Sequence, residues 1–271
     1  MPRLGTVPTE PPTTEAPLSG TVALVTGASS GIGRATAGRL AALGADVAIV
    51  ARRADRLREL AADLVDGSGD RAPRIVPIET DVTRRDEAEA AVQRTVDELG
   101  RLDILINNAG VMLLGPIVDA PVEEWDRMLE VNVRGLLSCA HAALPHLLAA
   151  ADEGPRNVAD LINVSSVAGR VPRLGSGVYN ATKHAVGAFS ESLRQEVTQR
   201  HVRVALIEPG AVATELAGHN RPEVLQGLRQ RFADMERLAD DDIADAIGYV
   251  VTRPRHVAIN EVLIRPTEQQ Q

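Results

Sequence analysis

The sequence is poor in several residue types, and each shortage excludes a class of protein. A single cysteine, Cys139, cannot form an internal disulfide, and its apolar helical surroundings predict a small buried hydrophobic residue. Aromatic residues make up only 2% of the chain, so aliphatic side chains and alanine must build the core. No uninterrupted apolar run reaches the ~18 residues of a membrane helix, so no membrane partner is expected.

Positive charge is also in short supply. The formal net charge is −8, which argues against nucleic acid as a partner. The histidines show no spacing with cysteine or carboxylates that is typical of a metal site, so no metal is predicted. They are His141, His146, His184, His201, His219 and His256.

The N-terminal segment and the remainder of the chain differ in composition. Residues 1–19 contain five prolines and several threonines but no apolar signal-peptide core, which predicts a disordered tail. The remaining residues, 20–271, are long enough for one domain with a full core. Without a targeting signal, a cytoplasmic location is expected.

Strand-like and helix-like segments alternate along this domain. Such alternation predicts an α/β fold in which a doubly wound parallel sheet is covered by helices on both faces. One long irregular stretch, 211–239, indicates a lid over the site. The expected strands are 22–26, 46–51, 74–79, 103–107, 160–165, 203–208 and 257–264, and the expected helices 34–43, 53–65, 84–99, 122–150, 177–200 and 240–251.

Only one of the 29 basic residues is a lysine, Lys183, and it follows Tyr179 by four positions. On a helix, positions i and i+4 share a face, so the ammonium and the phenol point into the same space. Lysine is a compact charge whose pKa can shift, which suits proton chemistry. The alternative is a surface helix in which this pair occurs by chance.

A glycine-rich segment follows the first expected strand. Thr26 to Gly33 reads TGASSGIG, and it lies between the apolar run 22–25 and an expected helix. Glycines at 27, 31 and 33 allow a tight turn and a close approach of backbone N–H groups to a pyrophosphate. Between a strand and a helix this pattern predicts a dinucleotide site, although glycine triplets also occur in ordinary turns.

Five motifs in order resemble the compact single-domain short-chain dehydrogenase/reductases. They are the glycine-rich segment, Asn107-Asn108-Ala109-Gly110, Ser166, Tyr179 with Lys183, and Pro209-Gly210, and the resemblance covers residues 20–265. It implies a seven-stranded Rossmann-like sheet, a nicotinamide cofactor, and a homodimer or homotetramer built on helices 122–150 and 177–200. Apolar residues on these helices agree with such an interface: Leu136, Leu137, Leu144, Leu147, Leu148, Val186 and Phe189.

The resemblance also implies four catalytic residues. Tyr179 corresponds to the acid/base, and Lys183 to the residue that lowers the phenol pKa and holds the cofactor ribose. Ser166 corresponds to the donor of a hydrogen bond to the substrate oxygen, and its 13-residue distance from Tyr179 distinguishes it from Ser165. Asn132 corresponds to the anchor of a proton relay. The alternatives are a cap for Ser166 and a hydrogen-bonded kink for Asn132.

The cofactor is expected to be NADP(H). An NAD site usually has an acid at the end of the second strand, whereas this strand ends in Ala51-Arg52-Arg53, and guanidinium groups suit a 2′-phosphate. The alternative is that both arginines face solvent at the start of the next helix. The remaining residues that the resemblance places at the cofactor are Gly27, Ser29, Ser30, Gly31, Ile32, Gly33, Asp81, Val82, Asn108, Ala109, Gly110, Tyr179, Lys183, Pro209, Gly210, Val212 and Thr214.

Shorter segments, including Gly110–Ile117, Phe189–Val197 and Arg265–Glu268, resemble bacterial clavaldehyde dehydrogenase-like and NADP-dependent 3-hydroxy acid dehydrogenase-like members. The loop Arg170–Ser176 departs from them, so the substrate is not carried over. An aliphatic substrate pocket is expected from Met112, Leu113, Val167, Val171, Leu174, Val178 and segment 211–236. Arg170 and Arg173 are either ligands for a substrate carboxylate or, as is commoner for loop arginines, solvent-facing.

The sequence therefore predicts an NADP(H)-dependent oxidoreductase that interconverts a ketone or aldehyde and an alcohol, with Tyr179 as the acid/base. Two alternatives remain open. One is a non-catalytic dinucleotide-binding sensor or assembly protein on the same fold, and the other is an NAD-dependent hydroxy acid dehydrogenase.

Overall fold

Seven parallel strands form one sheet in the computed structural model, which describes residues 16–66 and 72–270. The strand order is β3-β2-β1-β4-β5-β6-β7, as a doubly wound sheet requires, so the predicted fold is confirmed. The strands are β1 (Val22–Thr26), β2 (Asp46–Ala51), β3 (Ile75–Glu79), β4 (Ile104–Asn107), β5 (Ala159–Val164), β6 (Val202–Pro209) and β7 (Glu261–Ile264).

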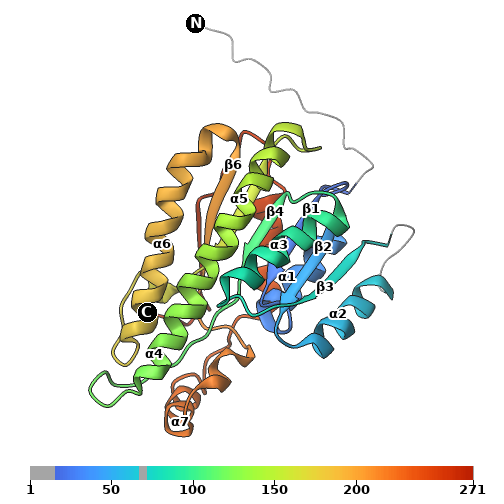
Figure 1. Ribbon diagram of the computed structural model, residues 1–271. Coiled ribbons are helices and arrows are strands. Elements are labelled where there is room, and N and C mark those ends of the chain that lie inside the picture. Colours follow the sequence, from blue (N-terminus) through green and yellow to red (C-terminus); the bar gives the residue numbers. More distant parts are fainter. Residues whose placement is uncertain (1–15, 67–71, 271) are drawn as a thin grey trace, which may run out of the picture.

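Helices cover both faces of the sheet (Figure 1). One hydrophobic core lies between the sheet and α3 (Arg85–Leu99), α5 (Leu136–Glu153) and α6 (Gly177–Val197). The second core lies on the opposite face, against α1 (Gly31–Ala42), α2 (Ala54–Asp66) and α8 (Asp240–Val251). The central strands β1, β4 and β5 are buried along their whole length, which explains why Val, Ile, Leu and Ala predominate in them without alternating with polar residues.

The chain changes winding direction between β1 and β4. These neighbours pair in register from Ala23 with Ile104 to Val25 with Ile106, so their carboxyl ends lie side by side. At this switch point the connections leave toward opposite sides, which opens a crevice beyond the strand ends. The two loops that follow, beginning at Gly27 and Asn108, are therefore brought together by topology.

Two predicted elements differ from the structure. The expected helix 122–150 consists of α4 (Val122–Leu129), a π-helical turn η1 (Glu130–Gly135) and α5. The segment expected to be irregular, 211–239, contains the 3-10 helix η4 (Glu215–His219) and the helix α7 (Pro222–Arg231), which projects beyond the carboxyl ends of the strands (Figure 1). Gly227 inside α7 weakens the helical pattern in the sequence, whereas Pro222 at its first turn is a favourable start.

The folded part begins before residue 20, the start that composition predicts. Residues 1–15 lie outside the described part of the chain, but Leu18 is fully buried and its N–H donates to the Leu43 carbonyl over 2.9 Å. Residues 16–19 thus pack against the end of α1. Composition missed them because the proline-rich sequence continues up to Pro17.

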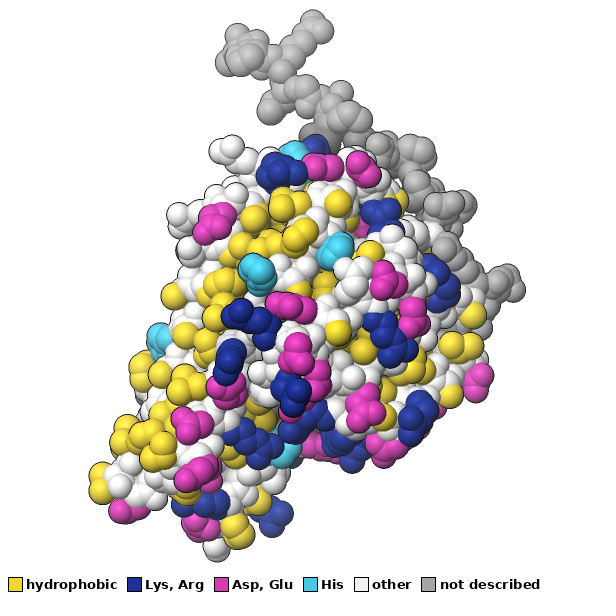
Figure 2. Space-filling model, viewed as in Figure 1, with side chains coloured by type: hydrophobic (Ala, Val, Ile, Leu, Met, Phe, Trp, Pro, Cys, Tyr) yellow, Lys and Arg dark blue, Asp and Glu magenta, His cyan; other side chains and the backbone are white. Residues whose placement is uncertain are grey.

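Apolar residues of the two long helices divide between the core and the outer face. Leu136, Leu147 and Val186, which were expected at an interface between subunits, are buried within the chain. Leu137 is 36% exposed, and the space-filling view shows hydrophobic side chains between charged ones over α5 and α6 (Figure 2). Across residues 16–66 and 72–270, none of the helices combines the length and hydropathy needed to cross a bilayer.

Candidate active site

A cavity of about 400 Å³ lies beyond the carboxyl ends of β1, β4, β5 and β6. The structure brings to it every residue predicted for catalysis or cofactor binding except Gly33 and Asn132, which lie just behind its wall. Those that line it are Gly27, Ser29, Ser30, Gly31, Ile32, Arg52, Arg53, Asp81, Val82, Asn108, Ala109, Gly110, Ser166, Tyr179, Lys183, Pro209, Gly210, Val212 and Thr214. Their individual roles remain predictions.

The glycine-rich turn is packed so closely that it excludes larger residues. Gly27 has a φ of +68°, and a Cβ there would lie 2.8 Å from the Ala109 Cα. A Cβ at Gly33 would collide with the Gly27 carbonyl oxygen, so Gly33 lets α1 begin directly behind the turn. No side chains of these glycines therefore cover the backbone in front of the N-terminus of α1. A pyrophosphate fits such a turn, because it can approach the backbone N–H groups closely.

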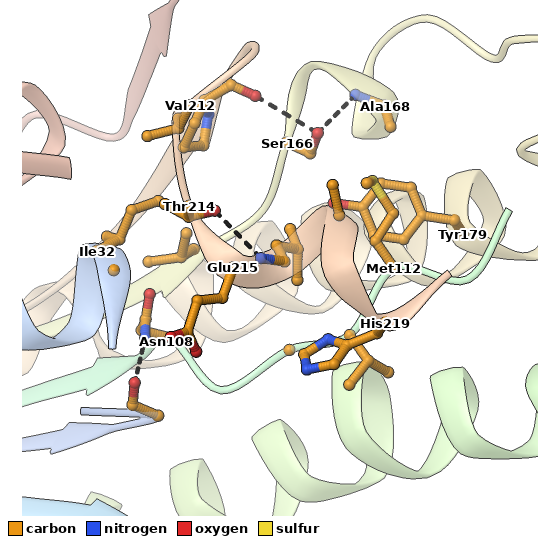
Figure 3. Close-up of a pocket in the computed structure, with 18 of the residues that line it drawn as sticks. Ile32, Asn108, Met112, Ser166, Ala168, Tyr179, Val212, Thr214, Glu215 and His219 are labelled. Atoms are coloured by element: carbon orange, nitrogen blue, oxygen red, sulfur yellow. Dashed lines mark hydrogen bonds between the residues drawn. The ribbon is translucent and has the colours of Figure 1, made fainter. Parts of the chain in front are cut away.

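Asn108 joins this turn to the end of β4. Its Nδ2 donates to the Thr26 carbonyl over 3.0 Å and to the Gly27 carbonyl over 3.3 Å (Figure 3). The Thr26 hydroxyl accepts in return from the backbone N–H groups of Asn108 and Ala109, each over 3.0 Å. These four hydrogen bonds fix the two loops of the switch point relative to each other.

The two arginines after β2 have different surroundings. The Arg53 guanidinium turns toward the glycine-rich segment, where it donates to Ser29 Oγ over 2.9 Å and to Ser30 Oγ over 2.8 Å. It also pairs with Glu215 at 3.0 Å. Arg52 lines the cavity with an exposed side chain and has no ion pair among the described residues. The cavity thus carries cationic donors at this end.

Asp81 and Val82 form the adjoining wall. The Asp81 carboxylate accepts from the backbone N–H of Thr83 at 3.0 Å and from its hydroxyl at 2.8 Å, which closes the turn after β3. Val82 is buried against the π-helical turn, and a Cβ at Gly135 would lie 2.9 Å from it. The close contact between Val82 and η1 therefore depends on Gly135.

Tyr179 and Lys183 lie one turn apart on α6, and both are buried. The lysine Nζ lies 5.8 Å from the centre of the tyrosine ring and donates to the Val164 carbonyl over 2.9 Å. Burial raises the pKa of Tyr179 to about 12, and a hydrogen bond with Ser166 acts in the opposite direction. Burial lowers the pKa of Lys183 to about 8. The expectation of a lowered phenol pKa is thus wrong for this state, because desolvation dominates.

Ser166 follows β5 and caps the short helix η2 (Val167–Gly169). Its Oγ accepts from the Ala168 N–H over 3.1 Å and donates to the Pro209 carbonyl over 3.4 Å. In Figure 3 Ser166 and Tyr179 both border the cavity, as the predicted roles require. Ser165 also lines the cavity, but it is buried and its hydroxyl donates to the Lys183 carbonyl over 3.2 Å. The choice of Ser166 as the catalytic serine stays a prediction from the 13-residue spacing.

Asn132 lies in the π-helical turn, and both the oxygen and the nitrogen of its side-chain amide form hydrogen bonds. Its Oδ1 accepts from the Val111 N–H over 2.8 Å, and its Nδ2 donates to the Val111 carbonyl over 2.9 Å and to Thr182 Oγ1 over 3.2 Å. These bonds join η1 to the loop after β4 and to α6. The widened turn, which is frequent at functional sites, presents Asn132 behind Gly110 and near Lys183.

The segment after β6 covers the opposite side of the cavity. Thr214 caps η4 through a hydrogen bond from the Leu216 N–H at 3.4 Å, and its Cγ2 would lie 3.0 Å from a Cβ at Gly31 (Figure 3). This segment therefore closes directly over the glycine-rich turn. A side chain at Gly31 would separate the two.

Two polar residues that hold this cover were missed in the sequence. Asn220 bonds the Leu114 N–H at 2.6 Å and the Met112 carbonyl at 2.9 Å, over 100 positions away. Gln269 accepts from the Ala211 N–H at 2.9 Å, which brings the C-terminal segment to the cavity. Neither residue belongs to a local pattern, so only the folded chain reveals them.

The predicted substrate pocket is partly corrected. Met112 and Val167 line the cavity, whereas Leu113 and Val178 pack behind it. Leu174 is fully exposed and Val171 is 38% exposed, so neither lines the cavity, because their loop turns outward before α6. Other apolar residues take their place: Leu114, Val131, Ala168, Leu216, Ala217, Leu228 and Phe232.

Of the two loop arginines, Arg170 is exposed, as expected, and only Arg173 differs from the commoner expectation. Arg170 is held by Glu208 at 2.7 Å and by Glu261, and is not a lining residue. Arg173 is half-buried and lines the cavity, so the solvent-facing interpretation is wrong for it. Among the described residues, no group of three or more His, Cys, Asp and Glu side chains could share a metal ion.

Comparison with known proteins agrees with this arrangement. A family model described as short chain dehydrogenase matches residues 21–224. An uncharacterised oxidoreductase of Staphylococcus aureus (strain MRSA252) is 37% identical over 249 residues, covering 92% of this chain and 98% of the relative.

Solved structures give the same assignment. The closed form of a serine dehydrogenase complexed with NADP+ has a TM-score of 0.81 and 34% identity, covering 93% of this chain and 97% of that one. A 3-ketoacyl-(acyl-carrier-protein) reductase from Brucella melitensis complexed with NADH has a TM-score of 0.78 and 30% identity, covering 92% and 98%. Similar structures thus include complexes with either nicotinamide cofactor.

Proposed function

Because the chain belongs to the short-chain dehydrogenase family of oxidoreductases, we propose that it interconverts a ketone or aldehyde and an alcohol with NADP(H) as its cofactor. One observation carries the proposal. A single cavity holds Ser166, Tyr179 and Lys183 at one part of its wall and the bare glycine-rich turn at another. A dinucleotide on that turn can therefore reach the tyrosine.

The cofactor residues fit a nicotinamide dinucleotide. Gly27 and Gly33 keep Cβ atoms away from the turn, and the N-terminus of α1 favours the pyrophosphate. Arg52 and Arg53 follow β2 where an NAD site usually has an acid, and their guanidinium groups favour a 2′-phosphate. When bound, the cofactor supplies or accepts the hydride.

The chain's own residues then handle the proton. Tyr179 is neutral at physiological pH because burial raises its pKa to about 12, so it is ready to donate to the substrate oxygen. Ser166 donates a second hydrogen bond to the same oxygen and stabilises the charge that develops there. Lys183, with a pKa lowered to about 8, returns a proton toward Tyr179, and it would hold the ribose of a bound cofactor.

Asn132 positions this machinery. Its bonds to Val111 and Thr182 hold η1 against α6, on the side from which Lys183 enters the cavity. The apolar lining, including Met112 and Phe232, excludes water from the reacting atoms.

The test follows cofactor absorbance when the purified protein and NADPH receive a panel of aldehydes, ketones and keto acids. We expect turnover of at least one carbonyl compound that depends on Tyr179. NADPH binding without turnover of any compound would instead favour the non-catalytic sensor or assembly protein.

We also propose a homodimer or homotetramer whose interface includes α4, α5 and α6. Leu129 of α4 and Leu137 of α5 are 46% and 36% exposed. Figure 2 shows hydrophobic side chains at the surface over α5 and α6. Apolar side chains on an outer helix face favour association.

A further inference from the structure

Arg170 and Arg173 lie three positions apart on one loop, yet only Arg170 has acidic partners. The Arg170 Nε lies 2.7 and 2.9 Å from the two Glu208 oxygens, and its Nη2 pairs with Glu261. The Arg173 guanidinium has no hydrogen bond or ion pair with any residue of 16–66 or 72–270. Its Nε and Nη2 are nevertheless screened from bulk solvent, so two cationic donors have no hydrogen-bond partner among the described residues.

The two unpartnered atoms form the edge of the guanidinium that binds carboxylates elsewhere in this chain. Arg203 places Nε and Nη2 2.7 and 3.0 Å from the two oxygens of Asp160. Arg101 does the same with Asp103, at 2.8 and 2.9 Å. In Arg173 this edge has no carboxylate, although it has the shape for a bidentate one.

Further positive charge surrounds Arg173. Burial lowers the pKa of the Arg173 guanidinium, and the nearby charges of Arg231, at the end of α7, and Arg265, after β7, lower it further. Neither forms an ion pair within the described part of the chain, and the Arg265 Nε is also buried without a hydrogen-bond partner. Three arginines from three separate elements therefore converge without an acid to neutralise them, an arrangement that an anion would stabilise.

This cluster belongs to the catalytic cavity. Arg173 and Arg231 line it together with Ser166 and Tyr179. Arg53, from the other arginine group that lines it, already has the carboxylate of Glu215 as a partner. Uncompensated charge thus lies not only with Arg52, beside the glycine-rich turn, but also with residues of the loop before α6 and of α7.

We propose that the substrate carries a carboxylate, which Nε and Nη2 of Arg173 bind side-on. The carbonyl group of the same substrate then contacts Tyr179 and Ser166. This inference rests on the proposed carbonyl chemistry and adds the class of substrate to it. Arg231 and Arg265 supply long-range attraction. Since the two donor atoms are screened from solvent, the Arg173 side chain or α7 shifts when the acid binds.

The first experiment measures binding without turnover. Succinate and its neutral diamide, succinamide, are titrated by calorimetry into the protein with saturating NADP+ and without it. The variants are Arg173→Gln, Arg173→Lys and, as the matched control, Arg229→Gln, which removes an exposed charge from α7 outside the cavity.

The parent should bind succinate at least ~10-fold more tightly than succinamide. Arg173→Gln should abolish this difference, Arg173→Lys should restore part of it because an ammonium cannot form the fork, and Arg229→Gln should match the parent. Equal binding of the two compounds by the parent, or undiminished binding of succinate by Arg173→Gln, would overturn the proposal. Tighter binding of inorganic phosphate than of succinate would also overturn it.

The second experiment separates this inference from the proposed function. The parent and Arg173→Gln are compared in NADPH-dependent reduction of 4-oxobutanoate and of its methyl ester. We expect the parent to prefer the acid by ~10-fold or more in kcat/KM, Arg173→Gln to lose this preference, and the control Arg229→Gln to reduce both compounds as the parent does. Equal reduction of both by the parent would contradict the carboxylate site and leave the proposed function intact. Arg173-dependent succinate binding without reduction of either aldehyde would support the site and contradict the proposed function.

Discussion

The Glu215 carboxylate lies 3.0 Å from Nη1 of Arg53 and ties the cover after β6 to the arginines after β2. Its other oxygen lies 2.7 Å from Arg56, and the hydrogen bonds from both arginines lower the pKa of Glu215 to about 2. The carboxylate is therefore ionised at any physiological pH. It pairs with Arg53, one of the two arginines that the proposed function assigns to the 2′-phosphate.

If the Glu215 carboxylate and the 2′-phosphate compete for Arg53, removing the carboxylate should raise the affinity for NADPH. Glu215→Gln should bind NADPH about 2–5-fold more tightly, as expected for one partly exposed charge pair, with little change for NADH. Fluorescence titration of both cofactors measures the effect. Glu223→Gln, an exposed acid on α7, is the control for the change in net charge. Weaker NADPH binding by Glu215→Gln would mean that the bridge stabilises the bound state instead.

Arg52 should favour NADPH over NADH, because it lines the cavity without an acidic partner among the described residues. The parent should bind NADPH at least ~10-fold more tightly than NADH, and Arg52→Asp should narrow or reverse this ratio. Arg58→Asp makes the same change in charge on α2 outside the cavity and should leave the ratio unchanged. Equal affinities of the parent for NADPH and NADH, measured by titration, would contradict the proposal that the protein prefers NADP(H).

Tyr179→Phe should separate binding from chemistry. The ring still packs in its buried position, so the NADPH affinity should stay close to that of the parent. Turnover should fall by ~10²–10⁴-fold because the proton donor is lost. Lys183→Arg should lower both turnover and cofactor affinity, since a guanidinium differs in shape and reach. Carbonyl reduction by Tyr179→Phe at the parent's rate would rule out the proposed mechanism.

The two shifted pKa values predict how the rate depends on pH. Tyr179 keeps its proton up to about pH 12, whereas Lys183 loses its proton near pH 8 because burial disfavours the ammonium. The rate of reduction should therefore be constant below about pH 8 and fall above it. A profile of kcat against pH at saturating NADPH measures this. A rate that stays constant to about pH 10 would exclude Lys183 from the relay.

The exposed Leu137 on the outer face of α5 leads us to expect an oligomer in solution. Light scattering at micromolar concentration should give a dimer or tetramer of the 28.8 kDa chain, and Leu137→Glu should reduce the mass to that of one chain. Val65→Glu, at an exposed position of α2, should leave the mass unchanged. A parent protein of 28.8 kDa in solution would contradict the proposed interface.

Features that depend on neighbours in the chain could be predicted before the fold was known. Apolar runs such as 22–25 fixed the buried parallel strands, and the glycine spacing fixed the turn that follows β1. The four-residue spacing of Tyr179 and Lys183 fixed their common helix face, because helical geometry is local. The fold class followed from these features, and the family resemblance added most of the catalytic and cofactor residues that line the cavity.

Contacts between side chains that are far apart in the sequence became known only from the folded chain. Arg53 pairs with Glu215, 162 positions away, and Asn220 holds the backbone at Met112. Arg170 and Arg173 look alike in sequence, but the carboxylates of Glu208 and Glu261 reach only the first. Such pairings depend on how β6, β7 and the following segments pack around the switch point. No local period records that packing, so the charge that remains free in the cavity could be found only in the folded chain.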